Sequence, residues 1–141
     1  MNFYHFTSLY HLEKIKESGY IKTTASNLFP PDKETFRVID GKAMDKNYNY
    51  RQVVWLTNQI MPTAQSIGVN GSTVNKLAVR LTISTDTVPD IKRWKYFADE
   101  EKMDATWRNL FEHGRKASSW YVVEHNIPLE DVIAIDILSN Y

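Results

Sequence analysis

The chain has 141 residues, of which 17 are basic and 17 acidic, so its formal net charge at pH 7 is zero. Apolar residues make up 43% and aromatic residues 13%, which excludes an intrinsically disordered chain and predicts one well-packed domain over residues 1–141. The balanced charge removes the basic surplus typical of general nucleic-acid-binding proteins, and the absence of cysteine excludes disulfides and thiolate metal sites.

The first predicted element is a short aromatic strand over residues 3–7, followed by a helix that ends at Gly19. Side chains alternate along a strand, so His5 and Thr7 face one side together. Thr7 or Ser8 can cap the helix by accepting a backbone hydrogen bond. Its buried stripe is predicted to consist of Leu9, Leu12 and Ile15.

The middle of the chain alternates loops with strands. Residues 22–52 show no period and contain several turn formers, so we expect a long loop that is either a lid over a binding site or a plain insertion. Residues 53–57 are β-branched and aromatic, which predicts a buried strand. Pro62 is well placed to start a short helix that ends near Gly68. Residues 76–83 alternate as a half-buried strand does, with the inward positions Leu77, Val79, Leu81 and Ile83.

The last third combines one helix with two strands. Residues 99–113 predict a helix whose apolar face contains Met103, Trp107, Leu110 and Phe111. Residues 119–124 and 132–138 predict strands, separated by a turn over residues 127–131. Two or three helices and five to seven strands in this order predict an α+β fold with mixed or antiparallel sheets. No glycine fingerprint follows the first strand, which disfavours a doubly wound nucleotide fold.

Glu124 is the carboxylate with the clearest functional interpretation. It ends a strand on the face of Trp120 and Val122, where apolar neighbours could raise its pKa or let it bind a sugar hydroxyl. The alternative is a solvated charge at a strand end. His5 taken by itself is a weak candidate, because a histidine flanked by aromatic residues is more often a satisfied core residue.

Other candidates flank the central strand. Trp55 could stack on a ring or fill the core, and Thr57 could donate a hydrogen bond in a cleft or in a turn. Arg51 and Arg80 are the candidate ligands for a pyrophosphate, because a guanidinium binds phosphate oxygens in pairs. The four histidines lack metal-ligand spacing, so we expect no metal. Without a signal peptide or a membrane-spanning run, we expect a cytoplasmic protein with no membrane partner.

Three of these segments together resemble the ADP-ribosyltransferase superfamily, in particular small bacterial and phage transferases and DNA-modifying toxins. Residues 4–19 are similar to its pattern of a strand histidine, a hydroxyl residue and a short helix. Residues 54–57 resemble its middle strand, and residues 120–124 could supply its late strand with a glutamate. The resemblance implies a domain with split β-sheets and two or three helices.

The resemblance also implies NAD as co-substrate and the roles of several residues. His5 and Thr7 would seat NAD, and Glu124 would hold the nicotinamide ribose and stabilise the oxocarbenium-like state. Tyr20, Trp55 and Tyr50 are the candidates for stacking on nicotinamide. Arg51 and Thr57 complete the expected cofactor-binding set.

The expected function is therefore transfer of ADP-ribose from NAD to an acceptor protein or nucleic acid. The chain lacks the Ser-Thr-Ser and Glu-x-Glu motifs of the arginine-specific toxins, since position 122 is Val122. A non-catalytic nucleotide-, nucleic-acid- or protein-binding module and an NAD glycohydrolase remain the alternatives. The transferase interpretation requires His5 and Glu124 to open into one cavity.

Overall fold

β1 (Asn2–Thr7) lies in the middle of the main sheet of the computed structural model, which describes residues 1–25, 38–39, 42–43, 51–100 and 105–140. The strand order of this sheet is β11-β7-β1-β6-β9-β8, with β3 paired to β6. Its other strands are β3 (Thr24–Ala25), β6 (Gln52–Thr57), β7 (Val79–Ser84), β8 (Lys92–Arg93), β9 (Trp120–Val123) and β11 (Val132–Ile137).

Two small sheets complete the described strands, and every registered strand pair is antiparallel. One joins β2 (Tyr20–Ile21) to β10 (Ile127–Pro128), and the other joins β4 (Val38–Ile39) to β5 (Lys42–Ala43). The α-helices are α1 (Leu9–Ser18), α2 (Trp94–Glu100) and α3 (Ala105–Glu112), and short 3₁₀ turns cover Ala117–Ser119 and Leu129–Asp131. The predicted α+β class with antiparallel sheets is confirmed.

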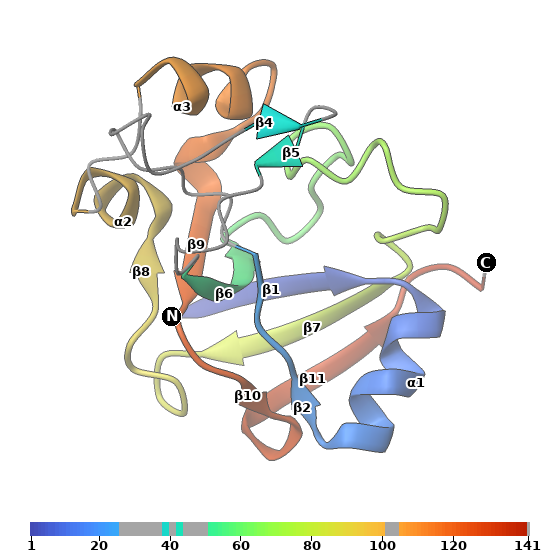
Figure 1. Ribbon diagram of the computed structural model, residues 1–141. Coiled ribbons are helices and arrows are strands. Elements are labelled where there is room, and N and C mark those ends of the chain that lie inside the picture. The colour runs from blue at the N-terminus through green and yellow to red at the C-terminus, as the bar shows by residue number, and fades with distance from the viewer. Residues whose placement is uncertain (26–37, 40–41, 44–50, 101–104, 141) are drawn as a thin grey trace.

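The main sheet has two halves that meet at a narrow junction. β1 and β7 pair along six positions, whereas β1 and β6 share a single registered pair, Tyr4 with Thr57. Figure 1 shows β1, β7 and β11 side by side, with α1 beside them and with α2 and α3 at the opposite side of the molecule. The junction between β1 and β6 therefore determines how the two halves sit against each other.

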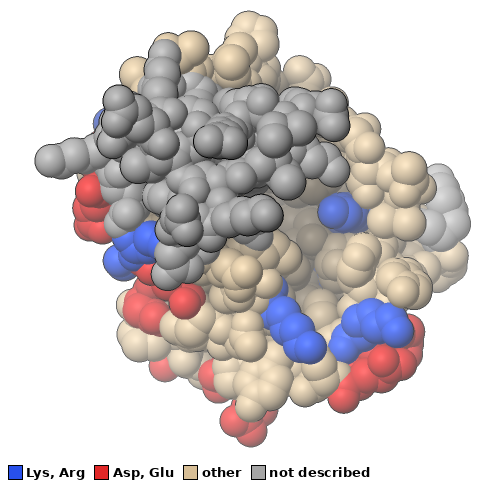
Figure 2. Space-filling view, in the orientation of Figure 1, with Lys and Arg blue, Asp and Glu red and all other residues tan. Residues whose placement is uncertain are grey.

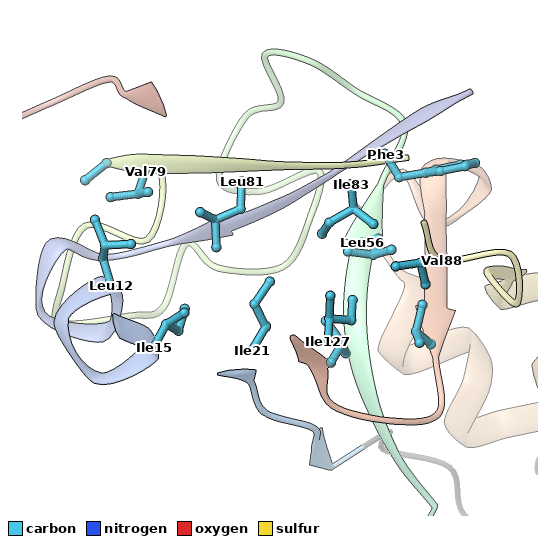
Figure 3. Packing of buried hydrophobic residues seen from close by; sticks show 13 residues of the cluster. Phe3, Leu12, Ile15, Ile21, Leu56, Val79, Leu81, Ile83, Val88 and Ile127 are labelled. Carbon is cyan, nitrogen blue, oxygen red and sulfur yellow. The ribbon is translucent and has the colours of Figure 1, made fainter. Parts of the chain in front are cut away.

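The first hydrophobic core lies between the β1–β7 face and α1 (Figure 3). Val79, Leu81 and Ile83 alternate along β7, and each is fully buried, as the sequence predicts. Leu12 and Ile15 of α1 pack against this face. Thr82 is also buried, at 7% exposure, so β7 is more enclosed than the half-buried strand that its pattern predicts, and it begins at Val79 rather than at residue 76.

The second core is aromatic and lies between β6, β9 and α2. Trp94 and Phe97 of α2 are fully buried, and the Trp94 ring centroid lies 4.9 Å from that of Trp55 and 6.1 Å from that of Trp120. Such tilted and edge-on pairs add to the burial of the rings themselves. This core fixes β9 and its neighbour α2 as one unit.

The first helix has the predicted ends. The Ser8 hydroxyl accepts a hydrogen bond from the His11 backbone N–H at 3.1 Å. Gly19 closes the helix at φ +80°, a left-handed conformation that favours glycine, and its N–H donates to the Ile15 carbonyl at 2.8 Å.

Two helix predictions are wrong in detail. Residues 62–68 form a turn and no helix, because the Thr63 hydroxyl and carbonyl accept hydrogen bonds from the Ser66 N–H and hydroxyl and replace a helical ladder. The predicted helix over residues 99–113 begins at Ala105, and the separate α2 precedes it. Leu110, placed on the apolar face by the sequence, is 68% exposed, while Phe111 packs against the aromatic core.

The predicted loop over residues 22–52 contains the short strands β3, β4 and β5. The other predictions for this segment, including the lid and the stacking role of Tyr50, lie outside the described residues.

Candidate functional site

A cavity of about 550 Å³ opens where β1 and β6 separate. Residues 4–7 of β1 and residues 54–57 of β6 line it from both sides, beyond their shared pair. Its volume is in the range of small-molecule binding pockets. Strands from both half-sheets thus line this cavity at their narrow junction.

His5 links the two sides of this cavity. Its Nδ1 lies 2.8 Å from the Trp55 carbonyl oxygen, which can accept a hydrogen bond but not donate one, so Nδ1 carries the proton. Burial lowers the pKa of His5 more than the hydrogen bond to the Trp55 carbonyl raises it, and His11 and Lys76 act in the same direction as burial, which favours the neutral imidazole. In that tautomer Nε2 is a hydrogen-bond acceptor.

Of the other predicted cofactor-binding residues, all but Arg51 line the cavity. Thr7, Tyr20, Trp55 and Thr57 line the same cavity as His5. Thr7 is 6% exposed and Thr57 is 3% exposed, whereas Tyr20 is 45% exposed at the opening. Trp55 is consistent both with a ring that stacks on a ligand and with a core residue, because it lines the cavity and also packs in the aromatic core.

Basic side chains surround the cavity. Lys14, Lys22, Lys76 and Arg115 line it, and none of its described lining residues is acidic. Figure 2 shows the same face, where blue Lys and Arg atoms border the hollow. Positive charges around a concave site concentrate the field there and favour an anionic ligand.

His11 is a second imidazole in the lining, held by the helix cap. Its Nδ1 lies 2.6 Å from the Ser8 Oγ, which also accepts the His11 backbone N–H. The cap of α1 therefore fixes the ring as well as the helix end.

Glu124 and Arg51 lie outside the set that lines the cavity and bind each other instead. The Arg51 Nε donates to Glu124 Oε2 at 3.0 Å, and the Lys92 Nζ lies 3.1 Å from Oε1. The Arg51 guanidinium lowers the pKa of Glu124, with Lys92 acting in the same direction. The predicted rise in this pKa is therefore wrong, because two cations outweigh the apolar neighbours.

The remaining candidate cation, Arg80, is also used within the fold. Its Nη2 lies 3.3 Å from Asp136 Oδ2, and its Nη1 donates to the Ile60 carbonyl at 3.0 Å. It therefore stabilises β7 against β11 and is not among the residues that line the cavity.

Sequence reasoning missed Lys76, Arg115 and His11 as lining residues. Lys76 lies before β7 and Arg115 lies between α3 and the 3₁₀ turn Ala117–Ser119, so the tertiary fold brings two distant segments to one cavity. One usable signal was the spacing of His11, which follows His5 by six residues on the first helical turn beside the predicted site.

Comparison with protein-family models, with curated proteins and with solved structures finds no match to this chain. The α+β class comes from the structure itself, whereas the resemblance of the chain to the ADP-ribosyltransferases rests on the residue pattern alone. Within the described residues, no group of three or more His, Cys, Asp or Glu side chains is arranged to hold a metal ion. None of the described helices has the length and apolar character that crossing a membrane requires.

Proposed function

We propose that this chain binds NAD in the cavity between β1 and β6 and transfers its ADP-ribose to a protein or nucleic acid. The observation that supports NAD binding is the lining of the cavity, which combines aromatic rings with four cationic side chains and, among the described residues, has no carboxylate. A dinucleotide carries two rings and a negatively charged diphosphate, which suit such a lining.

The polar groups of the cavity suit the sugar parts of the ligand. His5 offers Nε2 as an acceptor for a ribose hydroxyl, since its Nδ1–H is used by the Trp55 carbonyl. The Thr57 Oγ1 already accepts the Gln59 backbone N–H at 3.1 Å, so its O–H remains to donate. Tyr20 and Trp55 are the described rings proposed to stack on the bases.

Glu124 is proposed to act in the transfer step, and it directly follows β9, the strand paired with the cavity-lining β6. Val54 of the lining pairs with Val123 of β9, and Glu124 is the next residue. To stabilise a cationic sugar, its carboxylate must exchange its bonds to Arg51 and Lys92 for the ribose.

A second candidate function is nucleotide binding without transfer. It is favoured by the ion pairs of Glu124, which hold the carboxylate away from the cavity lining. The two functions share the ligand and differ in what Glu124 does.

Two assays together distinguish transfer from nucleotide binding alone. Isothermal titration calorimetry with NAD tests binding, and release of nicotinamide together with transfer of labelled ADP-ribose to cell extract tests transfer. We expect Glu124→Gln to abolish release and to retain NAD binding, while Glu130→Gln, an exposed acid removed from the cavity lining, changes neither. NAD binding without release in the unmodified chain would support the binding module, and no NAD binding would refute the NAD-dependent transfer.

A further inference from the structure

Arg115 is held against the wall of the cavity on three sides. Its Nη1 donates to the Phe111 carbonyl at 3.2 Å, and its Cζ lies 5.5 Å from the centre of the Phe111 ring. The third side is Gly68, where an added Cβ would lie 3.2 Å from the Arg115 Cζ. The guanidinium therefore packs close to the Gly68 backbone, and a Cβ at this position would require the end of the Arg115 side chain to shift by a few tenths of an ångström.

The wall that holds Arg115 is itself fixed to the rest of the fold. The Ser66 carbonyl accepts hydrogen bonds from the Trp120 Nε1 and from the Lys116 N–H, both at 3.0 Å. The Gln65 side chain donates to the Gly114 carbonyl at 3.0 Å. These bonds join the 62–70 turn to the segment that carries Arg115, so the position of its guanidinium is set before any ligand arrives.

The charge of Arg115 has no acidic partner among the described residues. Three other arginines do have one: Arg51 pairs with Glu124, Arg80 with Asp136 and Arg108 with Asp99. Arg115 instead lines the cavity, as Lys76 does. A preorganised guanidinium without a carboxylate is suited to paired hydrogen bonds with phosphate oxygens.

We infer that Arg115 and Gly68 form a phosphate-binding subsite, with Lys76 as a second cation, and that its ligand is the diphosphate of a nucleoside diphosphate or of a dinucleotide. This inference deepens the proposed NAD site by naming the group that anchors the ligand. Arg115, Gly68 and Lys76 all lie outside residues 4–19, the strand-and-helix segment that resembles the transferases.

The test is calorimetric titration of ADP, inorganic pyrophosphate and adenosine into the full chain and its variants. Arg115→Met is expected to weaken ADP and pyrophosphate binding by about 10- to 100-fold, the range for charge-assisted hydrogen bonds, and to leave adenosine binding within about twofold. Lys116→Met removes the same charge at an exposed neighbour outside the cavity lining and is expected to leave all three within about twofold.

Two further variants protect the test against a folding defect. Arg115→Lys keeps the charge but loses the planar fork, so we expect an intermediate loss of ADP affinity with unchanged thermal unfolding. Gly68→Ala places a methyl group against the guanidinium at a φ of +75°, so it is measured together with thermal unfolding and is expected to weaken ADP binding less than Arg115→Met does, because the guanidinium stays in the site.

The outcomes divide the two proposals. Equal ADP affinity in Arg115→Met and the unmodified chain would overturn the subsite, as would a parallel loss of adenosine binding or no binding of ADP and pyrophosphate at all. Binding of ADP that depends on Arg115, without any binding of NAD, would support the subsite and refute the proposed NAD-dependent function.

Discussion

The burial of His5 predicts a pH-dependent stability that substitutions at this position should remove. Burial lowers the pKa of His5 in the folded chain, so as pH falls the unfolded chain takes up the proton first. The contribution is therefore complete above the ordinary histidine pKa of about 6.5 and is lost as pH falls toward the lower folded value. Between these values, the free energy of unfolding should fall by up to about 1.4 kcal/mol per pH unit.

Two substitutions separate the proton from the hydrogen bond. His5→Asn places an amide N–H where Nδ1 lies, 2.8 Å from the Trp55 carbonyl, and cannot titrate. His5→Phe leaves that carbonyl without its side-chain partner, which costs about 1–3 kcal/mol at all pH values. The asparagine variant should retain more stability than the phenylalanine variant and should show a weaker loss at acid pH than the unmodified chain.

The assay is urea unfolding monitored by tryptophan fluorescence between about pH 5 and pH 8. The difference between the unmodified chain and His5→Asn cancels the contributions of the other histidines. A difference that stays constant across this pH range would refute the reasoning, because it would show that His5 binds protons equally well in the folded and unfolded chain.

Three further predictions concern single contacts. Ser8→Ala removes the cap that accepts the His11 N–H and should lower the free energy of unfolding by about 1 kcal/mol in urea titrations, whereas Ser8→Asn should retain most of it. Leu81→Ala at a fully buried position should cost about 2–5 kcal/mol in the same assay, and a cost below about 1 kcal/mol would contradict the described core. The Asn126 carbonyl and the Asp90 carboxylate raise the pKa of His125, so its imidazole should titrate above about 6.5 in NMR spectra, and Asp90→Asn should move it down. Its stabilising effect is present at low pH and is lost as pH rises through the folded pKa.

The sequence predicted the elements that are determined locally. α1 has a cap, a stripe and a terminal glycine within residues 8–19, and β7 has a clear alternation, so both were identified with their buried faces. α2 was missed because Trp94 and Phe97 are buried by contacts with distant strands and show no amphipathic pattern over seven residues. The turn at residues 62–68 was wrongly predicted as a helix because hydroxyl–backbone bonds compete with helix formation.

The sequence identified candidate site residues on β1 and β6, but it missed the lining residues His11, Lys76 and Arg115. Alternation along β1 predicted His5 and Thr7 on one face, and both line the cavity together with Tyr4 and Phe6. Glu124 was expected to share that cavity with His5, but it is not among the described lining residues, and Arg51 and Lys92 bind its carboxylate. The proposed transfer therefore requires the carboxylate to leave these two partners. Such partners depend on the tertiary arrangement, since 73 positions separate Arg51 from Glu124.

The central place of β1 also affects how the chain reaches its fold. β1 covers residues 2–7, but its neighbours in the sheet cover residues 52–57 and 79–84, and β11 completes the far side of β7 from residues 132–137. During synthesis β1 therefore stays unpaired until residues 52–57 and 79–84 have been made. One edge of the apolar β7 stays unpaired until β11 has been made. We expect folding on a timescale of about milliseconds to seconds, as for other domains dominated by distant strand pairs, with the cavity formed late in the process.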